Sequence, residues 1–334
     1  MTAPAPAARP HGRLRTAGIA GAAILGLSAC GTGSAEETGT ADALTVVTTT
    51  SVYADVVREV AGDAVVVDPL IDSTAQDPHS YEATAQDRLA VEGADLVVLN
   101  GGGYDVFLED LAAQGDAPVV EAYEVAGPAA EAPEQAPHEG NEHEGHEHEG
   151  HEHGEANEHV WYDLDAMDDV AAAVADRLAE LDPDGADAYR ANAGSFAERL
   201  AELRQRLAEA PADGAAFVAT EPVAAYLLED AGLHDDTPAE LTAAVENGTD
   251  VPPLVLRQVR EELQDGHVGL LAFNAETSSG QTEQLRDDAR AAGAAVVEFT
   301  ETLPEDSTYL EWMDRNVTAV VAALRPSSTG TTAG

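Results

Sequence analysis

Six histidines recur between residues 138 and 153, and glutamates alternate with them. They are His138, His143, His146, His148, His151 and His153. Imidazole is a good ligand for zinc, copper, nickel and iron, and neighbouring carboxylates add attraction for cations. The tract has almost no apolar residues, so it cannot bury enough surface to fold and would hold metal only loosely. It therefore predicts low-affinity metal handling; the alternative is an acidic linker enriched in histidine by drift.

Four side chains outside the tract are candidates for a specific metal site. His79 lies within Asp-Pro-His-Ser-Tyr-Glu, and His159 lies at the ordered edge of the insert that holds the tract. Glu221 and Glu301 each follow a predicted strand. Two imidazoles and two carboxylates can bind zinc or manganese, although spacing alone leaves open whether the four converge.

Further polar and aromatic residues could support these ligands, because a ligating histidine donates its second N–H to an oxygen acceptor. The candidates are Tyr81, Asn100, Trp161, Tyr162 and Asn274. Core packing is the better interpretation for Trp161. The glycines at 101–103 lack the spacing of a phosphate-binding loop and predict a tight strand-to-helix turn. His234 and His267 are expected to face solvent in loops, and Glu298 to point away from Glu301.

The N-terminus has the pattern of a lipoprotein signal. Arg9, Arg13 and Arg15 precede an apolar stretch at 16–27, which is too short to span a bilayer, and Leu-Ser-Ala-Cys follows. Cys30 is the only cysteine, so it has no internal disulfide partner, and lipidation explains it best. We expect a signal peptide at 1–29, a tether at 30–41, and an exported protein anchored to the outer face of the cytoplasmic membrane. A plain signal peptide or a free thiol is the alternative.

Charge excludes one class of partner. The chain has 16 arginines, no lysine and 63 acidic residues, and its formal net charge is −47. Nucleic acid binding is not expected at such a charge. Like the stretch at 16–27, no later stretch is long and apolar enough to cross a membrane.

Two series of alternating strands and helices are expected to position the candidate ligands. The predicted strands are 44–49, 64–71, 94–100 and 117–123, then 215–220, 240–244, 268–274 and 294–300. Alternation of this kind indicates parallel sheets, and ligands bind beyond the carboxyl ends of such strands. The predicted fold is α/β, with two lobes, each a mostly parallel sheet flanked by helices, joined by one long rigid helix, and a metal site in the interlobe cleft.

The predicted segments follow from this fold. They are a first lobe at 42–182 with a disordered insert at 128–158, a connecting helix at 183–210, a second lobe at 211–325 and a disordered tail at 326–334.

From about residue 44 to 324 the chain resembles the zinc/manganese-type (cluster A-I) substrate-binding lipoproteins of bacterial metal ABC importers. The motifs that carry the resemblance are DPHSYE at 77–82, ADLVVLNGGGYD at 94–105, the His/Glu insert, HVWYD at 159–163, FVATEPVAAYLLEDAGL at 217–233 and VVEFTETLPEDSTYLEWM at 296–313. The resemblance implies a monomeric binding protein, not an enzyme, which delivers one divalent ion to a permease driven by a cytoplasmic ATPase.

The resemblance also implies ligands. His79 and His159 match the two histidine positions. Glu221 stands where zinc-type members usually have histidine and manganese-type members have glutamate, and Glu301 stands where many members have aspartate. The His-rich insert is typical of zinc-type relatives, and zinc binds above manganese at most nitrogen-containing sites, so zinc is favoured and manganese or iron is the alternative. A metal-buffering adhesin with a role in cell adhesion, and a zinc hydrolase, remain further alternatives; HExxH, a hydrolase signature, is absent.

Overall fold

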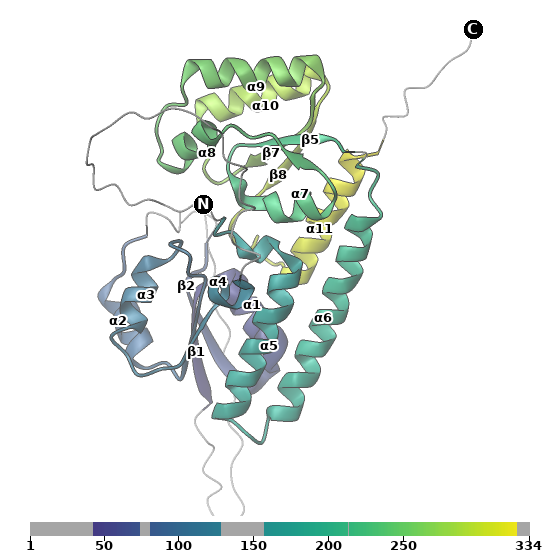
Figure 1. Ribbon diagram of the computed structural model, residues 1–334. Helices are drawn as coiled ribbons and strands as arrows, with labels where there is room; N and C mark the ends of the chain where they lie inside the picture. Colours follow the sequence, from purple (N-terminus) through teal and green to yellow (C-terminus); the bar gives the residue numbers. More distant parts are fainter. Residues whose placement is uncertain (1–42, 74–80, 128–156, 213, 326–334) are drawn as a thin grey trace, which may run out of the picture. The chain divides into compact units, whose positions relative to one another are not determined.

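Two four-stranded parallel sheets organise the chain in the computed structural model (Figure 1). The structure describes residues 43–73, 81–127, 157–212 and 214–325. Cys30, His79, the histidine tract and the predicted tether and tail lie outside the described residues. Within the described ranges, no helix has the length and apolar character to span a membrane.

The first sheet has the order β2-β1-β3-β4. Its strands are β1 (Leu44–Thr50), β2 (Val65–Ile71), β3 (Leu96–Leu99) and β4 (Val119–Glu121). The helices of this lobe are α1 (Ser51–Ala61), α2 (Ala85–Glu92), α3 (Val106–Ala112) and the short α4 (Ala122–Ala126), with a 3₁₀ turn at Gly62–Ala64. All four residues of β3 are buried, as expected for a central parallel strand covered on both faces.

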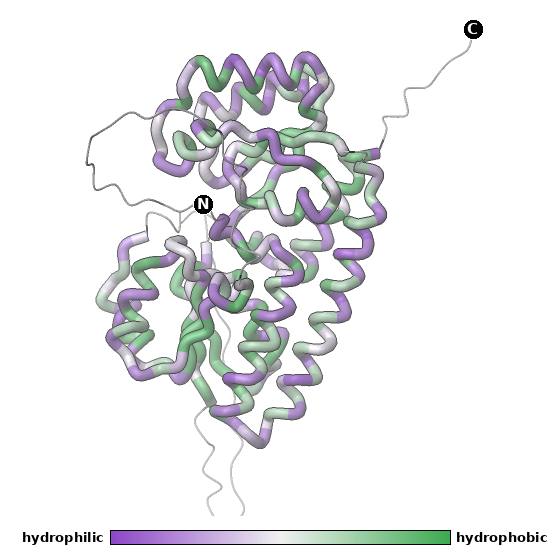
Figure 2. Tube along the Cα trace, viewed as in Figure 1, coloured by the Kyte–Doolittle hydropathy of each residue, from purple (hydrophilic) through white to green (hydrophobic). Residues whose placement is uncertain are grey.

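Two long helices link the sheets. They are α5 (Leu164–Leu181), which follows a 3₁₀ turn at Val160–Tyr162, and α6 (Ala186–Ala208). The Asp163 side chain caps α5 by accepting hydrogen bonds from the backbone N–H groups of Asp165 and Ala166. Helix α6 buries one apolar stripe, and Figure 2 shows the alternation of polar and apolar residues along the helix. Its buried members are Tyr189, Ala193, Phe196, Leu200, Leu203 and Leu207.

The second sheet has the order β6-β5-β7-β8. Its strands are β5 (Ala216–Ala219), β6 (His234–Asp235), β7 (Val268–Asn274) and β8 (Ala295–Phe299). A 3₁₀ turn at Pro222–Ala224 precedes α7 (Ala225–Asp230), and the remaining helices are α8 (Ala239–Glu246), α9 (Pro253–Asp265), α10 (Gly280–Ala292) and α11 (Tyr309–Ala323). The predicted α/β fold with two parallel sheets flanked by helices is confirmed.

The predicted strand at 240–244 is wrong, because this segment lies in helix α8. Leu241, Ala244 and Val245 are buried at steps of three and one, which places them on one helical face. The strand of this region is the two-residue β6, which pairs with β5 through Ala216 and His234. His234 is therefore a strand residue and not a loop residue, although it is exposed as expected.

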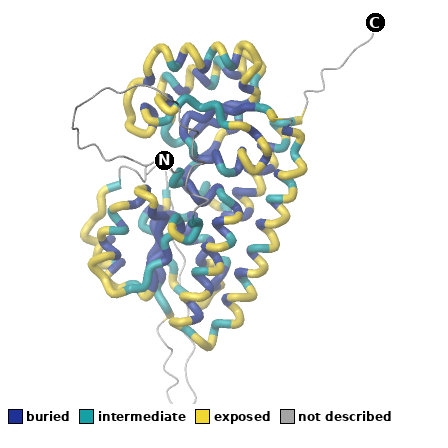
Figure 3. Tube along the Cα trace, in the orientation of Figure 1, coloured by how far each residue is buried: buried dark blue, intermediate teal, exposed yellow. Residues whose placement is uncertain are grey.

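One hydrophobic core joins the two lobes. A single cluster of buried residues includes side chains of β1 and β3 from the first sheet and of β5, β7 and β8 from the second. Helices α1, α5, α6 and α11 contribute most of its remaining members, and Figure 3 marks buried residues in dark blue along the chain. At the start of α11, the Tyr309 N–H donates to Asp55 Oδ2 of α1 at 2.6 Å. The last helix of the chain is thus fixed to the first.

Candidate metal centre

The carboxyl ends of three neighbouring strands bring two predicted ligands together. Glu221 lies two residues after the end of β5, Asn274 is the last residue of β7, and Glu301 lies two residues after the end of β8. Both glutamates are buried, with exposed fractions of 3% and 1%. Asn274 Nδ2 donates to Glu301 Oε1 at 2.7 Å and also to Glu221 Oε2. One amide therefore holds both carboxylates, which the parallel sheet places at the same edge.

Two hydroxyl groups also donate to these carboxylates. Thr277 Oγ1 donates to Glu221 Oε2, the same oxygen that Asn274 contacts. Tyr104 of the first lobe donates to Glu301 Oε2 at 3.4 Å. The Tyr104 contact joins the loop after β3 to the loop after β8, so both lobes border this part of the site.

The loop that carries Glu301 is held by Glu276. Glu276 Oε2 accepts from the backbone N–H groups of Glu301, at 2.7 Å, and Thr302, at 3.2 Å. Glu276 Oε1 accepts from the Thr302 hydroxyl at 2.6 Å, and the Glu276 N–H donates to Asn274 Oδ1 at 3.0 Å. Burial raises the pKa of Glu276 to about 7. The sequence analysis missed Glu276, although its position two residues beyond Asn274, at the same strand end, was a usable signal.

His159 is buried and is oriented by Asn157. His159 Nδ1 lies 2.7 Å from Asn157 Oδ1, and the His159 backbone N–H donates to the same oxygen at 3.1 Å. Because Asn157 Oδ1 can only accept, Nδ1 carries the proton and Nε2 is the nitrogen with a lone pair for a metal. This is the arrangement expected of a ligating histidine.

Asn157 also reaches the second lobe. Its Nδ2 donates to the carbonyl oxygen of Pro222 at 2.9 Å, and its own carbonyl accepts from the Tyr226 hydroxyl at 2.6 Å. The predicted insert at 128–158 therefore extends too far at its C-terminal end, because Asn157 and Glu158 belong to the described structure and are fixed by hydrogen bonds. Sequence reasoning missed both Asn157 and Tyr104.

The glycines at 101–103 form the predicted strand-to-helix turn. All three have positive φ, a backbone conformation that favours glycine, and a Cβ on Gly101 would also meet the Glu121 side chain. Asp105 Oδ2 accepts from the Asn100 N–H at 2.7 Å, and its Oδ1 accepts from the Gly101 N–H at 2.8 Å. Asn100 Nδ2 donates in turn to the carbonyl oxygen of Glu158 at 2.9 Å. The turn thus supports the residue that precedes His159.

The remaining candidates for support differ in their contacts. Tyr162 donates to the carbonyl oxygen of Thr300 at 2.8 Å, one residue before Glu301. Trp161 is core, as expected, with its ring 5.1 Å from that of His159. Tyr81 does not support the site through its hydroxyl, which donates instead to Asp87 Oδ2 at the start of α2. Asn274 has the supporting position that the sequence indicated.

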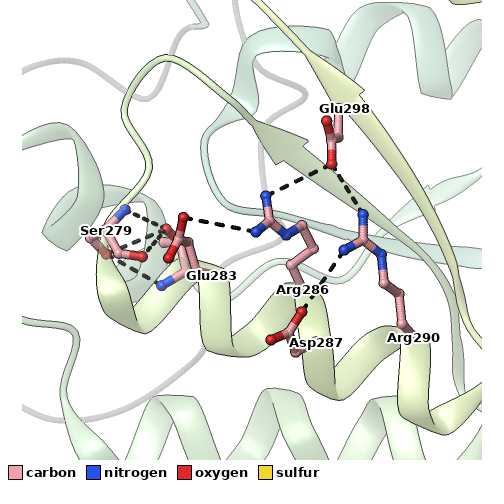
Figure 4. A network of polar contacts seen from close by, with 7 residues as sticks. Ser279, Glu283, Arg286, Asp287, Arg290 and Glu298 are labelled. Atoms are coloured by element: carbon pink, nitrogen blue, oxygen red, sulfur yellow. Dashed lines mark hydrogen bonds and ion pairs between the residues drawn. The ribbon is translucent and has the colours of Figure 1, made fainter.

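Glu298 and two exposed histidines lie outside the site. Glu298 binds Arg290 at 3.1 Å and Arg286 at 3.8 Å on α10, in agreement with its predicted outward direction (Figure 4). His267 and His234 are exposed, and their Nε2 atoms lie 2.9 Å and 3.3 Å from the two carboxylate oxygens of Asp236.

The structure describes three of the four predicted ligands, His159, Glu221 and Glu301. Among residues 43–73, 81–127, 157–212 and 214–325, no three His, Cys, Asp or Glu side chains form a cluster that could hold a metal ion. Glu221 and Glu301 both accept hydrogen bonds from Asn274. His159 lies beside Tyr104, which donates to Glu301, and the ring centroids of His159 and Tyr104 are 6.0 Å apart. Since His79 lies outside the described residues, the full ligand set stays a prediction.

Comparison with known proteins relates the chain to metal-binding components of transporters. The manganese ABC transporter substrate-binding lipoprotein PsaA of Streptococcus pneumoniae is 26% identical over 311 residues, covering 91% of this chain and 96% of PsaA. The structure of FpvC from Pseudomonas aeruginosa in complex with Mn²⁺ superimposes with a TM-score of 0.64 at 27% identity, covering 84% of this chain and 98% of FpvC. The periplasmic zinc binding protein TroA of Treponema pallidum has the same fold, with a TM-score of 0.66 at 21% identity and coverage of 85% and 99%.

A family profile covers most of the chain. The family described as zinc-uptake complex component A, periplasmic, matches residues 46–323. Members are substrate-binding proteins that work with a permease and an ATPase, which confirms the expectation that the chain is not an enzyme. The chain belongs to the zinc-uptake complex component A family and is a metal-binding component of an ABC importer.

Proposed function

We propose that the protein captures zinc between its two lobes, with His79, His159, Glu221 and Glu301 as ligands, and delivers the ion to the importer's permease. The observation that carries the proposal is the pair of buried glutamates held on one Asn274 amide. Two buried carboxylates are expensive to ionise in a protein interior, and a divalent cation offsets that cost. The buried, tautomer-fixed His159 supports a site with nitrogen ligands.

Manganese is the second candidate, and a specific observation favours it. Glu221 supplies a carboxylate where a third imidazole would suit zinc better, and PsaA is named for manganese. Against this, zinc binds above manganese at most sites that include nitrogen ligands. Competitive titration of the metal-free protein tests the choice: we expect the dissociation constant for zinc to be the lower one, and a lower value for manganese would overturn it.

The ligand assignment is tested by His79→Ala. We expect zinc affinity to fall by orders of magnitude, whereas His267→Ala, which changes an exposed histidine paired with Asp236, should leave it unchanged. Affinity should also fall as the pH is lowered, because ligating histidines must be neutral and glutamates ionised. Unchanged tight binding in His79→Ala would refute the assignment.

Two proposals concern residues outside the described structure. Cys30 carries the lipid anchor, so Cys30→Ser should move the protein from the membrane fraction to the soluble fraction.

The tract from His138 to His153 binds additional zinc weakly, so its deletion should lower the metal content measured by elemental analysis but spare the tight site. Retention of Cys30→Ser in the membrane fraction, or loss of the tight site on deletion, would contradict these assignments.

A further inference from the structure

We propose that Asn247 is a site of spontaneous deamidation in the folded protein, where this asparagine is converted to aspartate or isoaspartate. The chain contains two Asn-Gly pairs, at 100–101 and at 247–248. An asparagine followed by glycine is prone to this reaction, because glycine has no Cβ to hinder the attacking backbone nitrogen. The two pairs lie in very different surroundings, and these surroundings direct the reaction to the second pair.

The reaction needs only the chain and water. The backbone nitrogen of Gly248 attacks the side-chain carbon Cγ of Asn247, the new N–C bond closes a succinimide ring, and the bond from Cγ to Nδ2 breaks. Nδ2 leaves as ammonia and takes the proton of the Gly248 nitrogen with it. Water then opens the ring: attack at Cγ gives aspartate, and attack at the backbone carbonyl carbon gives isoaspartate.

Asn247 directly follows helix α8 in an exposed turn, and residues 246–250 are all exposed. Asn247 Nδ2 donates to the Ala243 carbonyl oxygen at 2.6 Å, and the Gly248 N–H donates to the Val245 carbonyl oxygen at 2.9 Å. The first bond restrains the leaving group and the second restrains the nucleophile. Both belong to the last turn of a short helix, so fraying of that turn is enough to release them.

The space around Gly248 is open. Its φ is 60°, and beyond its chain neighbours no heavy atom of the described residues lies within 4 Å of the place where a Cβ would stand. The turn can therefore rearrange to bring the Gly248 nitrogen to Cγ of Asn247 without displacing a packed side chain.

Asn100 provides an internal comparison, because the fold holds it from several sides. It is fully buried, its Nδ2 donates to the carbonyl oxygens of Gly101 at 2.8 Å and Glu158 at 2.9 Å, and its Oδ1 accepts from the Tyr53 hydroxyl. The Gly101 N–H, which would be the nucleophile, donates to Asp105 Oδ1 at 2.8 Å. Release of this pair requires an opening that separates several elements of the first lobe, which approaches global unfolding.

Deamidation changes the end of α8. An aspartate cannot donate to the Ala243 carbonyl oxygen as Asn247 does, and its carboxylate lies at the negative end of the helix dipole. Isoaspartate in addition lengthens the backbone just before Gly248. The change falls outside the proposed metal ligands, so the inference stands apart from the proposed function.

The test follows both pairs in the same molecules. Full-length wild type and Asn247→Gln are incubated at mildly alkaline pH, with and without urea. Glutamine keeps an amide at this exposed position but would have to close a larger and less favourable ring. Peptide mass spectrometry measures the replacement of NH₂ by OH at each asparagine, an isoaspartate-specific methyltransferase detects the rearranged product, and isoelectric focusing separates the more acidic form.

In the folded wild type we expect Asn247 to deamidate at least about a hundredfold faster than Asn100, since the first needs local opening and the second nearly complete unfolding. In urea the two rates should become similar, and Asn247→Gln should lose most of the acidic form that the folded wild type develops. Equal rates for the two pairs in the folded protein, or an unmodified Asn247 after a time in which the urea-treated chain has reacted, would overturn the inference. A hundredfold difference that persisted in urea would trace the effect to neighbouring residues instead of the fold, and would overturn it as well.

Discussion

Replacing Asn157 with alanine is the sharpest test of how the site is supported. The substitution removes the acceptor of the His159 Nδ1 and backbone N–H groups and the donor to the Pro222 carbonyl oxygen. The tautomer of the His159 imidazole is then no longer fixed, and the hydrogen bond from Asn157 to Pro222 between the lobes is lost. Every predicted ligand is unchanged.

The magnitude follows from these contacts. A hydrogen bond contributes about 1 kcal/mol net, so the three contacts together contribute about 3 kcal/mol, shared between folding and metal binding. The contact at His159 Nδ1 acts on binding, because it presents Nε2 to the metal, and loss of such a partner lowers metal affinity by roughly 10- to 100-fold. The contact at Pro222 acts on the stability of the metal-free protein.

The assay is chelator competition for zinc, run beside urea denaturation of the metal-free proteins. Asn157→Asp keeps the acceptor at His159 but replaces the donor to Pro222 with a charged oxygen that faces the carbonyl oxygen. It should therefore retain zinc affinity while losing at least about 1 kcal/mol of unfolding free energy. Asn192→Ala serves as the control for loss of a part-buried amide. Zinc affinity of Asn157→Ala within about threefold of wild type would refute the reasoning, because losing the partner that orients a ligating histidine should lower metal affinity at least about tenfold.

Three further predictions concern the scaffold. Asp55→Ala removes the carboxylate that accepts from the Tyr309 N–H at the start of α11 and should cost about 1–2 kcal/mol in urea denaturation; an unchanged midpoint would contradict this role. Burial raises the pKa of Asp105 to about 6 from 3.8, so the wild type should lose up to about 3 kcal/mol relative to Asp105→Asn as the pH rises from 4 to 7. The sign follows because a raised carboxyl pKa penalises the ionised form, and a difference in unfolding free energy that is independent of pH would refute it. Leu200→Ala, at a fully buried position in the shared core, should cost about 2–5 kcal/mol in one cooperative thermal transition; loss of only one lobe's signal would contradict a shared core.

The sequence predicted the long and strongly patterned elements well. The predicted strand at 268–274 matches β7 at both ends, because a continuous apolar run bounded by polar residues indicates a strand covered on both faces. The segment at 240–244, Glu-Leu-Thr-Ala-Ala, was misread because so short a stretch does not distinguish a strand from a helix by its pattern. The two-residue strand β6 has no pattern of its own and is defined by its pairing with β5.

The site was predictable where chain order determines position. Glu221, Asn274 and Glu301 lie at the carboxyl ends of neighbouring parallel strands, so topology alone places them at one edge. The contacts of Tyr104 and Asn157 could not be predicted, since Tyr104 meets Glu301 across 197 residues and Asn157 follows a low-complexity tract. Such contacts depend on how the lobes are joined, which no local pattern encodes.

The core shared by α1, α5, α6 and α11 has a consequence for protein engineering. A chimera that exchanged only the C-terminal half with a relative, with its junction after α6, would bring a foreign α11 against the resident α1 and α6. The mismatch would fall on packed apolar surface rather than on an exposed linker. The module suited to recombination is therefore the entire two-sheet body, and altered metal preference is better introduced by single substitutions at the strand ends.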